Sequence, residues 1–200
     1  GPGNLIDPSI SPDEKAMAFA RDPISGDGVN YYDVWLRDLV RGTETRLTSD
    51  GSANHPVWSP RGDRIVFSLV RGGRRDLYQK AASGSGESEL LVPSGTNAVA
   101  GQWSRDGRFI VYVDSTPKTR SDLWVIPIGE SAPADRKSVP FLRTDFEENQ
   151  GQISPDGHWM AYRSNESGQP AVYVRQFPSG EGKWRISTAG GEQPRWRGDG

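Results

Sequence analysis

Ile153-Ser154-Pro155-Asp156-Gly157 is the clearest copy of a phrase that recurs along this 200-residue chain. The other copies are Ile10-Ser11-Pro12-Asp13-Glu14, Trp58-Ser59-Pro60-Arg61-Gly62, Trp103-Ser104-Arg105-Asp106-Gly107 and Trp196-Arg197-Gly198-Asp199-Gly200. Neighbouring copies start about 43 to 50 positions apart, which is close to the length of a four-stranded propeller blade. The repeat therefore predicts an all-β chain made of β-propeller blades.

Each copy of the phrase is typical of a tight hairpin turn, because Pro sets φ at one central position and Gly supplies a positive φ at another. Short apolar runs with an aromatic residue follow the turns and predict second strands at 16–19, 64–67, 109–112 and 159–162. Third strands are expected at 33–36, 76–79, 122–125 and 171–174. More polar outer strands are expected at 45–48, 89–92, 140–142 and 184–187.

These strands divide residues 1–200 into a single partial propeller of four-stranded antiparallel blades. The predicted limits are about 5–53, 54–98, 99–148 and 149–191, and 192–200 would open a fifth blade. Insertions at 21–32 and 129–138 fall at turns, where a propeller tolerates extra residues.

The blades resemble the WD-like repeats of TolB-type propellers, and Ser154-Pro155-Asp156-Gly157 followed by Trp159-Met160-Ala161-Tyr162 carries this resemblance best. The stretch from Tyr162 to Trp196, with Trp184-Arg185-Ile186-Ser187 and Gly190-Gly191, is similar to the C-terminal propeller of bacterial serine/threonine protein kinases. The resemblance implies more blades than this chain contains, and hence a fragment of a larger bacterial protein. It also implies a periplasmic or other extracytoplasmic location. An unpaired blade edge would favour self-association of the isolated chain.

Composition argues against several classes of partner. The formal net charge is −2 and the basic residues are dispersed, so the chain lacks the basic stripe of a nucleic-acid-binding protein. It has no leader-like segment and no apolar run near the ~20 residues that span a bilayer, which predicts no membrane contact from this part of the protein. It has no Cys and only two His, so no metal site and no cofactor is predicted.

Enzymatic motifs are likewise missing from the sequence. It contains no kinase phosphate loop or catalytic loop, and no Ser with the flanking glycines of a nucleophile elbow. The repeated acids Asp13, Asp106, Asp156 and Asp199 are interpreted as turn formers, since none has the dense spacing of a calcium loop. The chain itself is therefore expected to be non-enzymatic.

A candidate ligand site comes from the repeat register. His55 lies three residues before Trp58, where the first strand of a blade enters from the channel mouth, and the matching positions hold Asp7, Ala100, Gln150 and Gln193. Propellers bind ligands where their innermost strands converge. The candidate ligand-binding residues are Asn54, His55, Gln150, Gln152, Gln193 and Arg195. The alternative is that they are solvated loop residues, as His158 is expected to be.

Two functions follow. The first is a non-catalytic protein- or ligand-binding module, the sensor or interaction region of a larger protein. The alternative is an accessory propeller that gates or binds substrate for a peptidase or a polysaccharide-active enzyme. Trp184 and Trp196 are the aromatic residues expected to serve as interface anchors.

Overall fold

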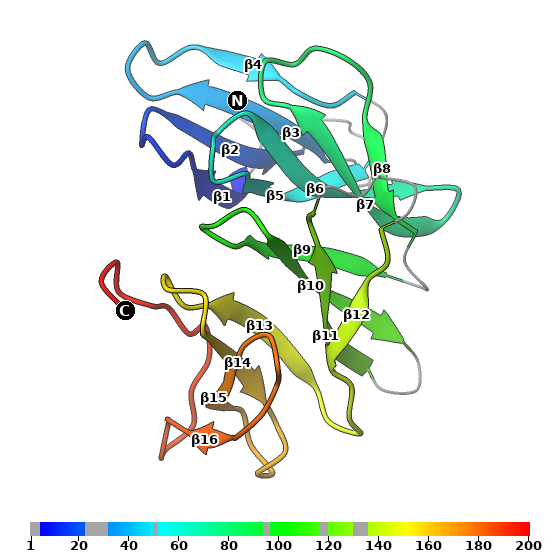
Figure 1. The fold of residues 1–200 in the computed structure, drawn as a ribbon. Coiled ribbons are helices and arrows are strands. Elements are labelled where there is room, and N and C mark those ends of the chain that lie inside the picture. Colours follow the sequence, from blue (N-terminus) through cyan, green and yellow to red (C-terminus); the bar gives the residue numbers. More distant parts are fainter. Residues whose placement is uncertain (1–4, 23–31, 50–51, 94–96, 117–119, 130–135) are drawn as a thin grey trace. The chain divides into compact units, whose positions relative to one another are not determined.

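The computed structural model describes residues 5–22, 32–49, 52–93, 97–116, 120–129 and 136–200. These residues form four sheets, each with four antiparallel strands, and none of them is helical (Figure 1). Within these ranges no helix capable of crossing a membrane is found. The chain divides into two compact units, Gly1–Ser94 and Gly95–Gly200, and each unit holds two of the sheets.

Unit 1 contains blades 1 and 2. Blade 1 is built from β1 (Leu5–Ile10), β2 (Ala16–Arg21), β3 (Asp33–Asp38) and β4 (Glu44–Arg46). Blade 2 is built from β5 (Ser52–Trp58), β6 (Arg64–Arg71), β7 (Arg74–Ala81) and β8 (Glu89–Val92). In both sheets, strands that follow one another in the sequence are hydrogen-bonded neighbours, which is the simple meander of a propeller blade.

Unit 2 contains blades 3 and 4 with the same meander. Blade 3 comprises β9 (Ala98–Trp103), β10 (Phe109–Thr116), β11 (Arg120–Pro127) and β12 (Val139–Leu142). Blade 4 comprises β13 (Glu148–Ile153), β14 (Trp159–Ser164), β15 (Ala171–Gln176) and β16 (Trp184–Arg185). The prediction of an all-β chain of four-stranded antiparallel blades is confirmed.

The outer strands differ in detail from the prediction. A strand was expected at 45–48, but β4 ends at Arg46 and the next two residues turn inward, so that Leu47 is buried. The backbone N–H groups of Leu47 and Thr48 both bond to the carbonyl of Val34. The expected strand at 184–187 is likewise cut short, since β16 ends at Arg185 and Ile186 and Ser187 both bond to Val172. An outer strand pairs on one side only, so at the end of β4 the burial of Leu47 outweighs extending the ladder. Burial does not explain the short β16, since Ile186 is 59% exposed.

Hairpin turns are closed by a repeated side-chain bond. The Ser11 hydroxyl donates to Asp13 at 2.7 Å and accepts the backbone N–H of Ala16 at 2.9 Å. Ser59 with Asp63, Ser104 with Asp106 and Ser154 with Asp156 repeat the arrangement. The bond from Ser154 is the main cause that lowers the pKa of the Asp156 carboxyl. The acids of the repeat are thus engaged within their own hairpins.

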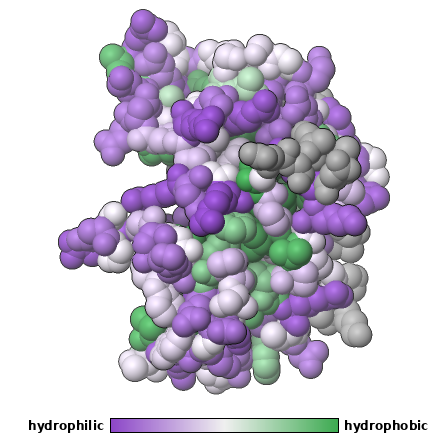
Figure 2. Space-filling view, viewed as in Figure 1, coloured by the Kyte–Doolittle hydropathy of each residue, from purple (hydrophilic) through white to green (hydrophobic). Residues whose placement is uncertain are grey.

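The core of each unit lies between its two blades. In unit 1 it includes Trp58, Ile65, Phe67, Leu69 and Tyr78, and in unit 2 Leu123, Met160, Tyr162, Tyr173 and Phe177. Charged and polar side chains cover most of the face drawn in Figure 2. The short apolar runs that face inward thus supply the core of each blade pair.

Residues 192–200, which were expected to open a fifth blade, contain no strand. A strand requires a backbone ladder, and no described segment forms one with these residues. The segment is held by side-chain bonds instead, since Trp196 Nε1 donates to the carbonyl of Gln152 at 2.9 Å. The predicted insertions at 21–32 and 129–138 lie largely outside the described residues.

Candidate ligand-binding residues at the inner strands

The innermost strands of blades 1, 2 and 4 carry a left-handed residue at one fixed repeat position, and the segment 192–200 carries one at the matching position. The φ angles are +52° at Asp7, +52° at His55, +55° at Gln150 and +53° at Gln193. None of the four is Gly, and such a conformation costs about 1–3 kcal/mol for a residue with a side chain. Ala100 of blade 3 holds the same repeat position and is not left-handed.

The left-handed residues in strands β1, β5 and β13 coincide with irregular pairing to the second strand. The register shifts between Ile6 and Ser9 in β1, between Asn54 and Val57 in β5, and between Asn149 and Gln152 in β13. A bulge of this kind bends a strand and redirects its side chains, and bulges are frequent next to binding sites. The bulge at each of these positions therefore sets the direction of the side chain that the left-handed residue carries.

In unit 1 the bulges bring Asp7, Asn54 and His55 together. The backbone N–H of His55 donates to Asp7 Oδ2 at 3.4 Å, and the imidazole Nε2 lies 3.6 Å from the same oxygen. The other ring nitrogen, Nδ1, is 3.0 Å from the side-chain oxygen of Asn54, which is buried. Burial lowers the pKa of the imidazole, and the nearby Asp7 charge opposes this effect. The hydrogen bond between Nδ1 and Asn54 therefore orients the imidazole, and Asp7 lies beside its other nitrogen.

In unit 2 the structure pairs Gln150 with Gln193. The side-chain oxygen of Gln150 accepts the backbone N–H of Gln193 at 2.5 Å, just as Asp7 accepts that of His55. Gln152 is half-buried, and its amide donates to the carbonyl of Gly151 at 3.0 Å. Arg195 is exposed and donates to the adjacent carbonyl of Pro194 at 3.1 Å. The six predicted residues thus form two groups, Asn54 and His55 in unit 1 and the other four in unit 2.

Sequence reasoning left two residues out of the candidate set. Asp7 was recognised as sharing the repeat position of His55, but its contact with that residue spans 48 positions of sequence. The side chain of Gln102 in β9 forms two hydrogen bonds with the backbone of Ile153 in β13. Its Nε2 donates to the Ile153 carbonyl at 3.3 Å, and its Oε1 accepts the Ile153 N–H at 2.6 Å. The signal for Gln102 was available, because it holds the same repeat position as Gln152 and Arg195.

The two predicted aromatic anchors have different surroundings. Trp184 is 46% exposed, and its ring meets that of Trp159 edge-on with centroids 5.5 Å apart. Trp196 is half-buried and its indole N–H is bonded to the chain. Only Trp184 presents a substantial aromatic surface to solvent.

The chemistry of both groups is that of hydrogen-bonding recognition. Unit 1 offers a carboxamide and an imidazole, and unit 2 offers carboxamides and a guanidinium. Each set can pair with a ligand's hydrogen-bond donors and acceptors. Across the described part of the chain, no group of three or more His, Cys, Asp or Glu side chains is arranged to hold a metal ion.

Comparison with known proteins bears on the fold. No family model matches the chain. An uncharacterized protein of Agrobacterium fabrum is 29% identical over 110 residues, which is 52% of this chain and 33% of that protein. The chain thus spans about a third of the curated relative that it matches.

Solved structures resemble the chain over nearly its whole length. A putative TolB from Agrobacterium tumefaciens aligns with a TM-score of 0.78 at 18% identity, covering 94% of this chain and 64% of that one. TolB from Acinetobacter baumannii aligns with a TM-score of 0.73 at 19% identity, covering 92% and 44%. A prolyl endopeptidase structure aligns with a TM-score of 0.67 at 14% identity, covering 89% and 27%.

The meander sheets and these alignments together define the class: the chain has a TolB-like β-propeller fold. It spans less than two thirds of the length of each of these solved structures. A fold shared at such low identity carries no assignment of activity, because propellers support many functions.

Proposed function

We propose that this chain is a non-catalytic binding module that recognises a protein or a small ligand through the left-handed residues of its inner strands. The supporting observation is the positive φ at Asp7, His55, Gln150 and Gln193. Backbone strain of this kind is kept where a side chain must be held in one direction, and it clusters at binding sites. Polar side chains at all four positions are suited to reading a ligand.

Contacts between blades support the same proposal. Asp7 of blade 1 accepts an N–H from His55 of blade 2, and Gln150 of blade 4 accepts one from Gln193. Each bulge is therefore braced by the next copy of the repeat. A site whose groups are oriented before the ligand arrives loses less conformational entropy on binding.

Two further parts of the proposal rest on resemblance alone. The TolB-like fold supports an extracytoplasmic location. The similarity of 162–196 to propellers that follow kinase domains supports a sensor role in a longer protein.

The test selects peptides that bind the chain and then compares their affinity for the chain with and without the side chains at the left-handed positions. Peptides are selected from a random phage library on the 200-residue chain. Their affinities are then measured for the unaltered chain and for a variant with Asp7→Gly, His55→Gly, Gln150→Gly and Gln193→Gly. Glycine adopts a positive φ without strain, so the variant loses the four side chains while the left-handed conformation stays accessible to its backbone. At least about tenfold weaker binding to the variant is expected.

Equal affinity of the selected peptides for both chains would overturn the proposal. A matched variant with Asp199→Gly, at an exposed turn, controls for non-specific effects. A second candidate function is an accessory propeller of a peptidase, which the fold shared with a prolyl endopeptidase supports. Mass spectrometry of the selected peptides after incubation with the chain adds a test of the first proposal, because cleavage that depends on the chain would contradict a non-catalytic module.

A further inference from the structure

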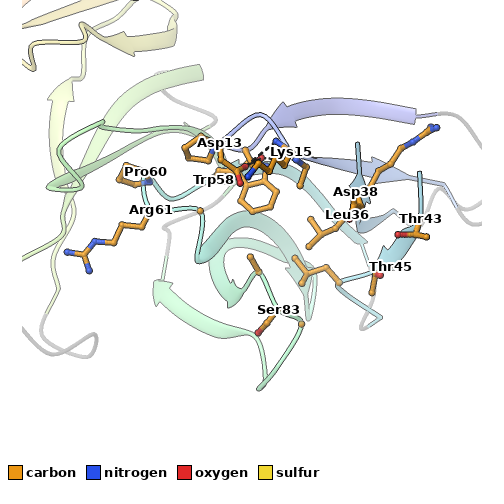
Figure 3. Close-up of a pocket in the computed structure, with 18 residues that line it drawn as sticks. Asp13, Lys15, Leu36, Asp38, Thr43, Thr45, Trp58, Pro60, Arg61 and Ser83 are labelled. Carbon is orange, nitrogen blue, oxygen red and sulfur yellow. Dashed lines mark hydrogen bonds between the residues drawn. The ribbon is translucent and has the colours of Figure 1, made fainter. Parts of the chain in front are cut away.

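Unit 1 contains a cavity of about 660 Å³ between blades 1 and 2 (Figure 3). Four turns surround it, one after each of β1, β3, β5 and β7, and they carry Asp13, Asp38, Arg61 and Ser83. Asp7 and His55 lie within β1 and β5 and do not line the cavity, whereas Asp13 and Arg61 lie in the turns that follow these strands. The cavity is therefore a different site from the one proposed above.

The cavity exists because two positions of the repeat carry small side chains. Ala16 opens β2 and Ala82 follows β7, and both line the cavity. In unit 2 the same repeat positions hold Phe109, which opens β10, and Phe177, which follows β15. One backbone bond shows that Ala82 and Phe177 hold the same repeat position. Each N–H donates to the carbonyl of the residue after a hairpin Gly, which is Asp63 for Ala82 and His158 for Phe177.

The rings of unit 2 occupy the corresponding space there. Phe109 and Phe177 meet edge-on with centroids 5.0 Å apart, and Phe141 lies 5.6 Å from Phe177. Unit 1 has methyl groups in place of two of these rings. A volume of this size falls in the range of small-molecule sites, about 300–1,000 Å³.

An aromatic wall in a fixed orientation lines the cavity. Trp58 is 8% exposed, and its indole N–H donates to the carbonyl of Ser9 at 3.0 Å. Figure 3 shows the Trp58 ring between the Asp13 hairpin and Leu36. Leu36 and Leu47 add aliphatic surface. A planar apolar group would find a preorganised stacking partner here.

The charges at the cavity mouth favour an anion. The Asp13 carboxylate accepts bonds from the Ser11 hydroxyl and the Lys15 N–H, and Asp38 accepts the N–H groups of Val40 and Arg41. Hydrogen bonds, from Ser11 to Asp13 and from Arg41 to Asp38, are the main causes that lower the pKa values of these carboxyls. Both acids are thus satisfied by their own turns.

The cations around the cavity are less engaged. Within the described ranges, the Lys15 ammonium and the Arg61 guanidinium form no hydrogen bond or ion pair, although the Lys15 charge attracts the Asp13 carboxylate. Arg37 lies 3.8 Å from Glu44. In Figure 3 the Arg61 side chain extends outward from the rim. Both Lys15 and Arg61 are exposed and flexible enough to reach a charge at the mouth.

From this combination we infer that the cavity binds a small aromatic carboxylate. Its ring packs against Trp58 between the blades, and its carboxylate lies at the mouth beside Lys15 and Arg61. The apolar interior gives the affinity for the ring, and the unpaired cations select the acid over an uncharged analogue.

N-acetyl-L-tryptophan and its uncharged amide are the probes for this site. Each is titrated into the ¹⁵N-labelled chain, and the indole N–H resonance of Trp58 is followed by NMR. We expect saturable shifts with the acid below about 10 mM, and at least about threefold weaker binding of the amide. No saturable shift at Trp58, or equal affinity for acid and amide, would overturn the inference.

Two variants locate the binding. Ala16→Phe places a ring where unit 2 has Phe109, and it should weaken binding of the acid at least about tenfold. Lys15→Gln should leave the amide unaffected and remove most of the preference for the acid. Lys137→Gln, an exposed lysine of unit 2, is the matched control and should change neither. If Ala16→Phe binds as tightly as the unaltered chain, or Lys15→Gln keeps the full preference, the cavity is not the site.

Discussion

The blade pair of unit 1 is hollow where the blade pair of unit 2 is filled, although both are built from the same repeat. In unit 2, Phe109, Phe141 and Phe177 pack together beside the core, whereas the cavity of unit 1 is lined by Ala16 and Ala82. The backbone bonds that close the turns and strand ends are the same in both. The repeat therefore specifies the blade, and the residues between blades decide whether the space becomes core or cavity.

Emptying the filled pair should have the largest effect. Phe177→Ala removes a ring that is 4% exposed and in contact with two others. We expect a loss of about 3–5 kcal/mol in the free energy of unfolding, from lost burial and the cavity that remains. Urea unfolding measures it. Phe146→Ala is the matched control, since Phe146 is 43% exposed and should cost little. Equal losses in the two variants would mean that the rings of unit 2 do not form a shared core.

Filling the hollow pair should have a smaller effect of opposite sign. Ala16→Phe adds buried apolar surface without displacing a neighbour, so we expect a gain of about 0.5–2 kcal/mol in the free energy of unfolding. Thermal and urea unfolding check this prediction. A loss of more than about 1 kcal/mol would show that the cavity walls cannot accept a ring as those of unit 2 do.

A second difference between the units concerns a buried acid. Glu148 opens β13 and is 2% exposed, whereas blade 2 has Ala53 at the same repeat position. Its Oε1 accepts the Thr144 hydroxyl at 2.5 Å, while Oε2 has no hydrogen-bond partner among the described residues. Burial is the main cause that raises the pKa of this carboxyl, and the charges of Asp122 and Glu166 add to it.

A raised carboxyl pKa means that the folded chain holds the proton more firmly than the unfolded chain does. The contribution of the protonated Glu148 to the free energy of unfolding is present below the ordinary carboxyl pKa of 4.5. It is lost as the pH rises through the pKa of the folded chain. Glu148→Gln should therefore become more stable relative to the unaltered chain between about pH 4 and pH 8, measured by urea unfolding.

Glu147→Gln is the control of opposite sign. The hydrogen bond from Arg120 is the main cause that lowers the Glu147 pKa, so this carboxylate contributes stability above its ordinary pKa and loses it as the pH falls. Parallel pH profiles for the two variants would contradict the assignment of Glu148 as the penalised buried acid.

The smallest effect is expected at the left-handed positions, where unit 1 has His55 and unit 2 has Gln150. The His55 pKa is lowered mainly by burial, so the unfolded chain takes up the proton first. The contribution of the neutral ring is present above the ordinary value of 6.5 and is lost as the pH falls through the folded pKa. His55→Gln should flatten this acid-side slope between about pH 7.5 and pH 5.

His158→Gln, at an exposed turn position, should leave the unfolding curve nearly unchanged at each pH and serves as the control. An acid-side slope that persists in His55→Gln would show that another group causes it.

Much of the fold could be predicted because it is written in local chemistry. Pro-Asp-Gly turns and the aromatic residue in each second strand placed the hairpins, and the four-stranded sheets confirm them. The outer strands were less predictable, because the turn of Leu47 into the core depends on burial rather than on local preference. The absence of a strand in 192–200 has a similar cause, since a ladder depends on a partner and not on the residue pattern.

The candidate site was predictable only in part. Repeat register correctly placed Asp7, His55, Gln150 and Gln193 at one structural position, and the shared positive φ supports that alignment. Whether a ligand binds there stays a prediction. Their partners could not be read from the sequence, because Gln102 and Ile153 are 51 positions apart and meet only once two blades have packed.

The sequence alone thus determined the repeat, the turns and the blade count, because each depends on residues a few positions apart. The tertiary structure alone decided that Ala16 and Ala82 border a cavity while Phe109 and Phe177 close one, and that the carboxylate of Asp7 braces His55. Those outcomes depend on the side-chain volumes and polar groups that two blades present to each other. These groups meet only when the blades are packed in contact.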